Sequence, residues 1–318
     1  MPPQPTSASF SFGPTSVSAI VILQMSAPGT LPGRSPAVKR VPPKRYNPSL
    51  LTTAPCPMRI ATWNVNGLRA RIEFLTIWLK DRAPDIVGLQ EIKVTDDQFP
   101  FEELEALGYH AVINGQKGWN GVAILSREPA EVIETELPGH DAMGSRLLTA
   151  RVAGLDFTTV YCPNGKTLTH EDYPAKLEWL AALAELFEGR SDGDLQTVLC
   201  GDFNVCPEPL DSWRGEAADG AIFHTVEERQ RTDAIRNSGL IDTYRDLYPD
   251  EQTFSWWDYR GGAFHRGHGL RIDHVYVSPA VRARAVRAQH DRDYRKKKDG
   301  FTASDHAPVI VDLDTAHD

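Results

Sequence analysis

The sequence predicts an α/β protein in which two largely antiparallel sheets pack face to face and helices cover their outer faces. From Met58 onward, strand-like and helix-like patterns alternate without a long linker. Some neighbouring strand patterns are joined by tight turns, which connect antiparallel strands, and others are joined by helices. The chain has 318 residues, 41% of them hydrophobic, so it can bury a core of this size.

The first half of this region begins with a strand pattern that ends in polar residues. A helix follows, because Ile72, Leu75 and Trp78 recur on one helical face, and Pro84 ends it. The expected strands here cover 59–66, 85–91, 109–113 and 121–126, and the expected helices cover 72–82 and 97–107.

The second half begins with a hairpin over 146–163 that turns at Ala153-Gly154. Apolar residues at helical spacing then indicate another helix; these are Leu177, Leu180, Ala184 and Phe187. Further strands are expected over 196–205, 270–278 and 307–313. No internal repeat is evident.

Residues 1–57 differ from the rest of the chain in composition. They are rich in Pro, Ser and Thr and contain no Asp or Glu; their charged residues are Arg34, Lys39, Arg40, Lys44 and Arg45. This composition indicates a disordered leader. An organellar transit peptide and a misassigned start, with translation beginning at Met58, are two further explanations. In each case the predicted folded domain spans 58–318.

Composition narrows the class of protein. No apolar run approaches the roughly 20 residues that span a bilayer, so we expect no membrane association. The four cysteines contain no CxxC pair, which favours a reducing cytoplasm, with association to the nucleoid if the source is bacterial. The net charge of −9 argues only weakly against a nucleic-acid partner, because binding depends on the electrostatic field at the binding face and not on the total charge.

Polar and charged residues stand at the ends of successive predicted strands. They are Asn64, Glu91, Tyr161, Asp202, Asn204, Asp273, Asp305 and His306. Each alone is better explained as a turn residue. Together at one edge, the carboxylates would repel one another unless a cation or phosphate were bound. Such oxygen-rich sites suit Mg²⁺ or Mn²⁺, whereas Zn²⁺ fits poorly because no thiol or second histidine has ligand spacing.

Seven motifs resemble, in order and spacing, those of the exonuclease III group of apurinic/apyrimidinic endonucleases. This group belongs to the endonuclease/exonuclease/phosphatase superfamily. The motifs are "TWNVNGLRAR", "GLQEIKV", "YCPNG", "GDFNVCP", "FSWWDYR", "GLRIDHV" and "SDHAPV". The resemblance runs from Met58 to about Leu313, so residues 58–318 are expected to be the catalytic domain.

The resemblance implies a four-layered α/β sandwich that hydrolyses DNA phosphodiesters with Mg²⁺ or Mn²⁺. The implied metal-binding residues are Asn64, Glu91, Asp202, Asn204, Asp305 and His306. Asp202 would activate the attacking water, and Asn204 would hold that water or a phosphate oxygen. His306, oriented by Asp273, would contact the scissile phosphate, and Tyr161 would bind the phosphate or help the leaving oxygen depart.

The resemblance also implies duplex DNA as the partner, with abasic sites, nicks or blocked 3′ ends, and a monomeric enzyme. It implies cleavage 5′ to an abasic site, 3′–5′ exonuclease activity with 3′-phosphodiesterase or phosphatase activity, or both. Trp256 would line the slot for the baseless sugar. Further candidate DNA contacts are Arg69, Lys93, Lys117, Asn164, Lys176 and Arg271. Residues 291–300 are expected to form a mobile basic loop near the duplex.

Three rival interpretations differ in class. Another phosphodiesterase of the superfamily, either a nonspecific DNase or a phospholipid phosphatase, is disfavoured by "QEIKV" and "FSWWDYR". A noncatalytic DNA-binding relative would have no need of so many catalytic groups. A hydrolase using Ser304 as nucleophile lacks the strand–GxSxG–helix elbow, and adjacent residues cannot easily align the hydroxyl with the imidazole.

Overall fold

The structure is a computed structural model that describes residues 57–315. The expectation of a disordered leader therefore lies outside the described residues, apart from Pro57. Among residues 57–315, no helix is both long and apolar enough to cross a membrane.

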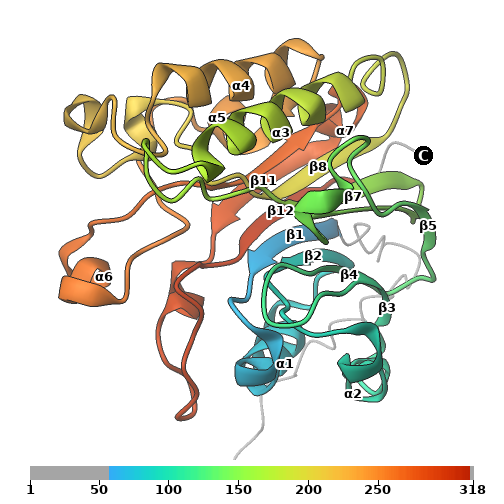
Figure 1. The fold of residues 1–318 in the computed structure, drawn as a ribbon. Helices are drawn as coiled ribbons and strands as arrows, with labels where there is room; N and C mark the ends of the chain where they lie inside the picture. Colours follow the sequence, from blue (N-terminus) through green and yellow to red (C-terminus); the bar gives the residue numbers. More distant parts are fainter. Residues whose placement is uncertain (1–56, 316–318) are drawn as a thin grey trace, which may run out of the picture. The chain divides into compact units, whose positions relative to one another are not determined.

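Twelve strands form two six-stranded sheets in the described region (Figure 1). The first sheet has the order β11-β12-β1-β2-β4-β3 and the second has the order β5-β6-β7-β8-β10-β9. The strands of the first sheet are β1 (Met58–Asn64), β2 (Ile86–Gln90), β3 (His110–Asn114), β4 (Val122–Ser126), β11 (Ala285–His290) and β12 (Val309–Leu313). Those of the second are β5 (Glu131–Glu134), β6 (Leu147–Val152), β7 (Leu155–Tyr161), β8 (Thr197–Asp202), β9 (Ile241–Asp242) and β10 (Asp273–Val277). In each sheet only the central pair, β1–β2 or β7–β8, is parallel, as expected for largely antiparallel sheets.

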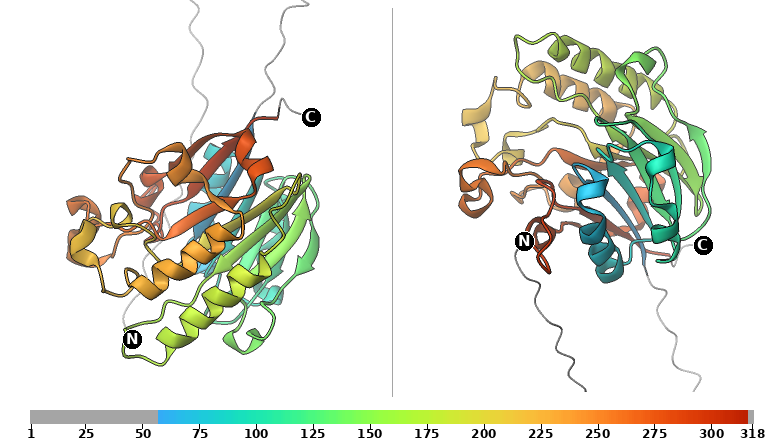
Figure 2. Two further views of the ribbon diagram at one scale, coloured as in Figure 1. Left: turned by 90° about the horizontal axis from the view of Figure 1, so that it is seen from above. Right: turned by 60° about the horizontal axis from the view of Figure 1, so that its bottom comes forward.

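Helices cover the outer face of each sheet, which gives the four layers implied by the resemblance. The α-helices are α1 (Ile72–Arg82), α2 (Phe101–Glu105), α3 (Asp172–Leu186), α4 (Val226–Asn237), α5 (Thr243–Leu247), α6 (Ala263–Arg266) and α7 (Pro279–Arg284). Seen from above, α3 and α4 lie side by side across the second sheet (Figure 2). On the first sheet, α1 and α2 pack against the opposite face from the second sheet.

Three apolar layers hold the sandwich together, and the period of two along each strand assigns residues to them. In β1, Ile60 enters the core between the sheets while Ala61 packs under α1. In β2, Gly88 allows close approach of the sheets, because a Cβ there would lie 2.5 Å from Oγ1 of Thr159. Trp179 of α3 closes the outer core of the second sheet.

The expected elements are present, but several that the sequence did not indicate appear as well. The hairpin turn at Ala153-Gly154 is found where expected, with both residues at positive φ. The helix expected over 97–107 is shorter, because α2 covers only Phe101–Glu105 after a 3₁₀ turn. Short or polar elements escaped prediction: β5, α4, β9, α5, α6, α7 and β11.

Candidate active site

The polar strand ends converge at one edge of the two sheets. Asn64 ends β1, Glu91 follows β2, Asp202 ends β8, and Asp273 begins the antiparallel neighbour β10. Because β1 and β2 are parallel, as are β7 and β8, their carboxyl ends meet at the same edge. His306 arrives there on the turn that precedes β12.

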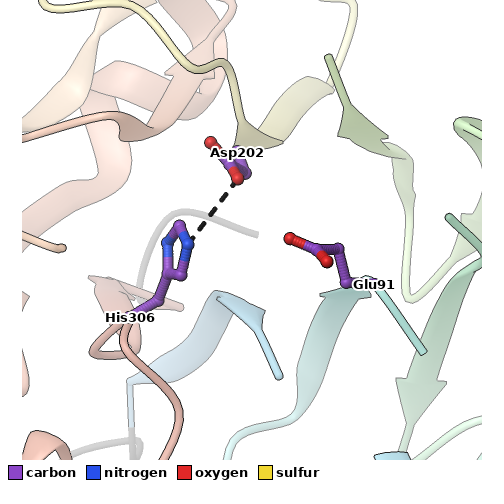
Figure 3. A group of neighbouring side chains, drawn as sticks. All are labelled: Glu91, Asp202 and His306. Atoms are coloured by element: carbon purple, nitrogen blue, oxygen red, sulfur yellow. Dashed lines mark ion pairs between the residues drawn. The ribbon is translucent and has the colours of Figure 1, made fainter. Parts of the chain in front are cut away.

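Three side chains from different elements form the centre of this edge (Figure 3). Glu91, Asp202 and His306 each offer one atom suited to a metal ion, and these atoms lie within 4.8 Å of one another. Nε2 of His306 is 3.8 Å from Oδ2 of Asp202. Asp202 and His306 are buried, whereas Glu91 is half-buried, so the cluster opens to solvent beside Glu91.

Asn64 connects the two carboxylates of this cluster. Its amide nitrogen donates to Oε1 of Glu91 at 2.8 Å and to Oδ2 of Asp202 at 2.9 Å. Its oxygen accepts from the backbone N–H of Asn66 at 2.9 Å. In this arrangement Asn64 positions both carboxylates through its amide nitrogen, and its role in metal binding stays a prediction.

The contact between Asp273 and His306 is present as expected. Nδ1 of His306 lies 2.9 Å from Oδ2 of Asp273. Asp273 is in turn held by the hydroxyl of Ser255, which accepts from its backbone N–H at 3.0 Å. The imidazole is therefore fixed at Nδ1 and presents Nε2 to the open cluster.

The turn before β12 carries a capping serine and a carboxylate. The hydroxyl of Ser304 donates to the backbone oxygen of Asn64 at 2.7 Å and accepts from the N–H of His306 at 3.2 Å. Asp305 accepts hydrogen bonds from Asn66 at 2.9 Å and from the Trp256 indole at 3.0 Å. Asp305 lies outside the group of Glu91, Asp202 and His306, and its carboxylate binds side-chain donors of the rim.

Part of the left-handed backbone in residues 57–315 lies at this edge. Three residues of the site adopt the left-handed region, with φ of 47° at Asn66, 52° at Glu91 and 53° at Asn204. Such conformations cost of order 1–3 kcal/mol each in a non-glycine residue and persist where the surroundings impose them, typically at functional sites. The strain therefore supports a functional interpretation of this edge.

The charges of the cluster perturb one another strongly. Burial raises the pKa of Asp202 to about 7, and the neighbouring carboxylates add to this although His306 opposes it. Burial lowers the pKa of His306, but the carboxylates of Asp273 and Asp202 more than offset this and raise it to about 10. At neutral pH the site thus holds an imidazolium beside a carboxylate that accepts a proton readily.

The donor set fits a divalent cation. Glu91 and Asp202 supply carboxylate oxygens, the ligands that Mg²⁺ and Mn²⁺ prefer, and the charge of a third carboxylate, Asp273, also acts on Asp202. Lys93 already pairs with Oε2 of Glu91 at 2.7 Å, so positive charge is favoured at this position. A cation bound between the carboxylates would relieve their repulsion.

Two amides and a phenol complete the edge. Asn204 receives a hydrogen bond on its oxygen from Asn164 at 3.0 Å, and its own backbone N–H donates to Oδ1 of Asp202 at 3.0 Å. Tyr161 ends β7, where burial and the charge of Glu91 raise its pKa well above the usual value. The phenol therefore retains its proton, which it shares with the carboxylate of Glu91.

Four of the candidate DNA contacts lie around the opening. Lys93 reaches Glu91, and Trp256 reaches Asp305 through its indole. Arg69 is exposed on the 3₁₀ turn Leu68–Ala70 and Lys117 on a loop that is hydrogen-bonded to the backbone of Lys93.

Asn164 is exposed beside Asn204, whereas the last two candidates, Lys176 and Arg271, do not reach the surface. Lys176 is fully buried and paired with Glu228 at 2.5 Å. Arg271 is 1% exposed and bridges the carboxylates of Asp211 and Asp242. Both guanidinium and ammonium groups are satisfied in the interior, so the expected phosphate contacts are replaced by structural ion pairs.

Sequence reasoning missed Asn66 and Arg146. Asn66 is hydrogen-bonded to the side chains of Asp305, Lys93 and Asn64; its place two residues after Asn64, in a segment already identified, was an available signal. Arg146 donates to the backbone oxygen of Tyr161 at 3.1 Å and lies over its ring. No local pattern distinguished Arg146 from other charged residues at a strand start.

Comparisons with known proteins agree with this geometry. The model of the Endonuclease/Exonuclease/phosphatase family matches residues 61–306. The exodeoxyribonuclease III of Haemophilus influenzae is 36% identical over 269 residues, covering 80% of this chain and 100% of that protein. A 3′ phosphatase from Neisseria, solved with a product DNA hairpin, is 38% identical with a TM-score of 0.77, covering 81% of this chain and 99% of that one. An AP endonuclease from Archaeoglobus fulgidus also gives a TM-score of 0.77, at 35% identity, covering 81% and 100% of the two chains.

Proposed function

We propose that this chain, which belongs to the exodeoxyribonuclease III group of the endonuclease/exonuclease/phosphatase family, cuts duplex DNA 5′ to abasic sites and processes blocked 3′ ends. The chain is a DNA repair nuclease and a phosphodiester hydrolase of a divalent-metal-dependent family. One observation carries the finer proposal: a proton-accepting carboxylate, a cationic histidine and a metal-binding carboxylate share one opening.

In this proposal Asp202 prepares the nucleophile. Its raised pKa suits it to take a proton from a water molecule, and Oδ2 is its oxygen on the side of His306. Asn204 holds Oδ1 of Asp202 through its backbone, and its side chain is fixed by Asn164. These contacts orient the base before the substrate arrives.

His306 stabilises the charge that develops on the phosphate. Nδ1 is held by Asp273, so Nε2–H of the imidazolium is free to donate to a non-bridging phosphate oxygen. A positioned donor of this kind is typically worth about 10²–10³ in rate. Tyr161 keeps its phenol proton and is placed to donate to the phosphate or to the leaving oxygen.

A divalent ion, Mg²⁺ or Mn²⁺, would be held by Glu91 with Asp202, and it would supply Lewis-acid stabilisation of the phosphate and leaving oxygens. Lys93 and Asn64 hold the carboxylate of Glu91 in place from either side. Asp305 positions the rim residues Asn66 and Trp256.

Substrate recognition would use the surface around the opening. Trp256, with its indole nitrogen fixed on Asp305, offers an aromatic face for a baseless sugar. Lys93, Arg69 and Lys117 would contact phosphates, which makes binding dependent on salt in spite of the acidic net charge. A monomer working in the cytoplasm is also part of the proposal and stays a prediction.

Product analysis tests the function. Labelled duplexes carrying one abasic site, one nick or a blocked 3′ end are incubated with Mg²⁺, with Mn²⁺ and with a chelator. We expect cleavage 5′ to the abasic site, leaving a 3′-hydroxyl, and release of the 3′ block, with both reactions lost in the chelator. Equal cleavage of intact duplex at all positions would instead indicate a nonspecific nuclease.

A further inference from the structure

A basic hairpin projects from the body of the protein beside the site; it is the red segment at the bottom of Figure 1. We call residues Tyr294–Ala303 the basic hairpin. Lys298 and Phe301 pair across it through two backbone hydrogen bonds of 3.3 and 2.8 Å. Asp299 and Gly300 form its turn with φ of 50° and 86°, as a two-residue turn that matches strand twist requires. Residues 291–300, expected to be a loop, thus comprise a 3₁₀ turn over Arg292–Arg295 and part of this hairpin, and their mobility stays a prediction.

The base of the basic hairpin is fixed to the catalytic turn. Tyr294 is fully buried, and its ring packs edge-on against Phe74 with centroids 5.8 Å apart. Arg295 donates to the backbone oxygens of Asp305 and Trp257, each at 3.1 Å. The hairpin and the turn that carries Asp305 thus form one connected unit.

The tip combines positive charge with an exposed aromatic ring. Lys297 is exposed and has no ion-pair or hydrogen-bond partner among residues 57–315. Lys298 lies over the ring of Tyr294 with its ammonium 4.3 Å from the centroid, and Phe301 is 40% exposed. Cationic side chains complement DNA phosphates, and apolar side chains next to them commonly insert into the minor groove.

The chain itself limits how far the tip can be from the scissile bond. Phe301 precedes His306 by five residues, and five residues span at most about 17 Å. At 3.4 Å per base pair, this distance corresponds to about five base pairs of duplex. Phe301 of the basic hairpin therefore lies within the length of about five base pairs of a phosphate bound at His306.

We propose that the basic hairpin is a second contact site for duplex DNA. Lys297 and Lys298 bind backbone phosphates within about five base pairs of the incised bond. Phe301 enters the minor groove that these phosphates flank. The inference rests on the proposed function, because that function supplies the duplex. It adds that the enzyme needs double-stranded DNA on this side of the lesion.

Equilibrium binding tests the hairpin separately from catalysis. The dissociation constant for a long abasic duplex is measured by fluorescence anisotropy over a series of KCl concentrations, for the wild type, Lys297→Ala, Lys297→Ala/Lys298→Ala and Phe301→Ser. Lys80→Ala is the matched control, since Lys80 is exposed in the last turn of α1, away from the site edge. Thermal melting confirms that each variant is folded.

We expect each lost phosphate contact to reduce the slope of log Kd against log salt by about 0.9. Phe301→Ser should weaken binding several-fold without changing the slope, and Lys80→Ala should match the wild type. Removing the duplex on the hairpin side, so that this arm is single-stranded, should erase the differences between variants. Hairpin variants that bind the long duplex like Lys80→Ala would overturn the proposal. Failure of the wild type to incise would overturn the proposed function instead, because the binding comparison does not depend on incision.

Discussion

Replacing Lys176 by methionine should destabilise the protein far more than the loss of an ordinary surface lysine. Lys176 and Glu228 are both 0% exposed and form an ion pair, and the ammonium also donates to the backbone oxygen of Asn204 at 2.7 Å. Lys176→Met leaves the carboxylate of Glu228 buried without its cation. Breaking a buried pair on one side costs about 3–5 kcal/mol.

Glu228 has a second role that sharpens the prediction. It caps α4 by accepting from the N–H of Thr225 at 3.1 Å, and this contact is not removed by Lys176→Met. The double variant Lys176→Met/Glu228→Gln removes both charges and keeps a side chain of similar shape. It should therefore be more stable than Lys176→Met alone, because no uncompensated charge remains buried.

The assay is urea unfolding followed by tryptophan fluorescence, with Lys166→Met as the control. Lys166 forms an ion pair with Asp172 on the surface, where such pairs contribute about 0.2–1 kcal/mol. The incision rate, measured at a temperature where all variants are folded, tests the effect of losing the hydrogen bond from Lys176 to the backbone oxygen of Asn204. We expect Lys176→Met to lower kcat more than it raises KM. A Lys176→Met variant within about 1 kcal/mol of the wild type would refute the reasoning.

The remaining predictions concern the reaction and the leader. His306→Ala should lower the single-turnover rate by about 10²–10³ and leave binding of abasic duplex measurable; near-normal turnover would remove His306 from the mechanism. Activity should fall as pH rises through the pKa of His306, which is about 10. Asp273→Asn removes a charge that raises this pKa, so it should shift the alkaline fall of the pH–activity profile to lower pH. An unshifted profile would mean that another group titrates there. Trp256→Ala should raise KM for abasic duplex more than for a 3′-phosphate end, as parallel kinetics on the two substrates would show. Deleting residues 1–57 should leave folding and incision intact, and loss of either in circular dichroism or cleavage assays would show that the leader is needed.

Much of the site was predictable because sheet geometry brings strand ends together. Asn64, Glu91, Asp202 and Asp273 stand at ends that meet at one edge once the strands pair as they do. The period-two pattern of the strands fixes which ends are buried, and polar groups there need partners. The packing of the second sheet on the first, which joins Asn64 to Asp202, required the structure.

The misplacement of Lys176 has a physical cause that the sequence already contained. Lys176 precedes Trp179, Leu180 and Leu183 at helical spacings of three, four and seven, so it lies on the buried face of α3. A lysine in that position needs a buried carboxylate, and its partner lies 52 residues away.

The partner, Glu228, belongs to α4, a helix that hydrophobic periodicity did not indicate because it contains few apolar residues. Its capping box, Thr225 with Glu228, was the available signal. The burial of Arg271 was not predicted for the same reason, because its ion-pair partners Asp211 and Asp242 come from separate segments.

The most direct test of the central claim is the single-turnover incision of a synthetic abasic duplex by the wild type and by Asp202→Asn, titrated with Mg²⁺. Asp202 is the carboxylate whose pKa burial raises within the cluster of Glu91, Asp202 and His306. The wild type should cut 5′ to the abasic site in a metal-dependent reaction, and the variant should lose at least about 10² in rate while still binding the duplex. Metal-independent cutting, or a variant that cuts like the wild type at saturating metal, would contradict the account.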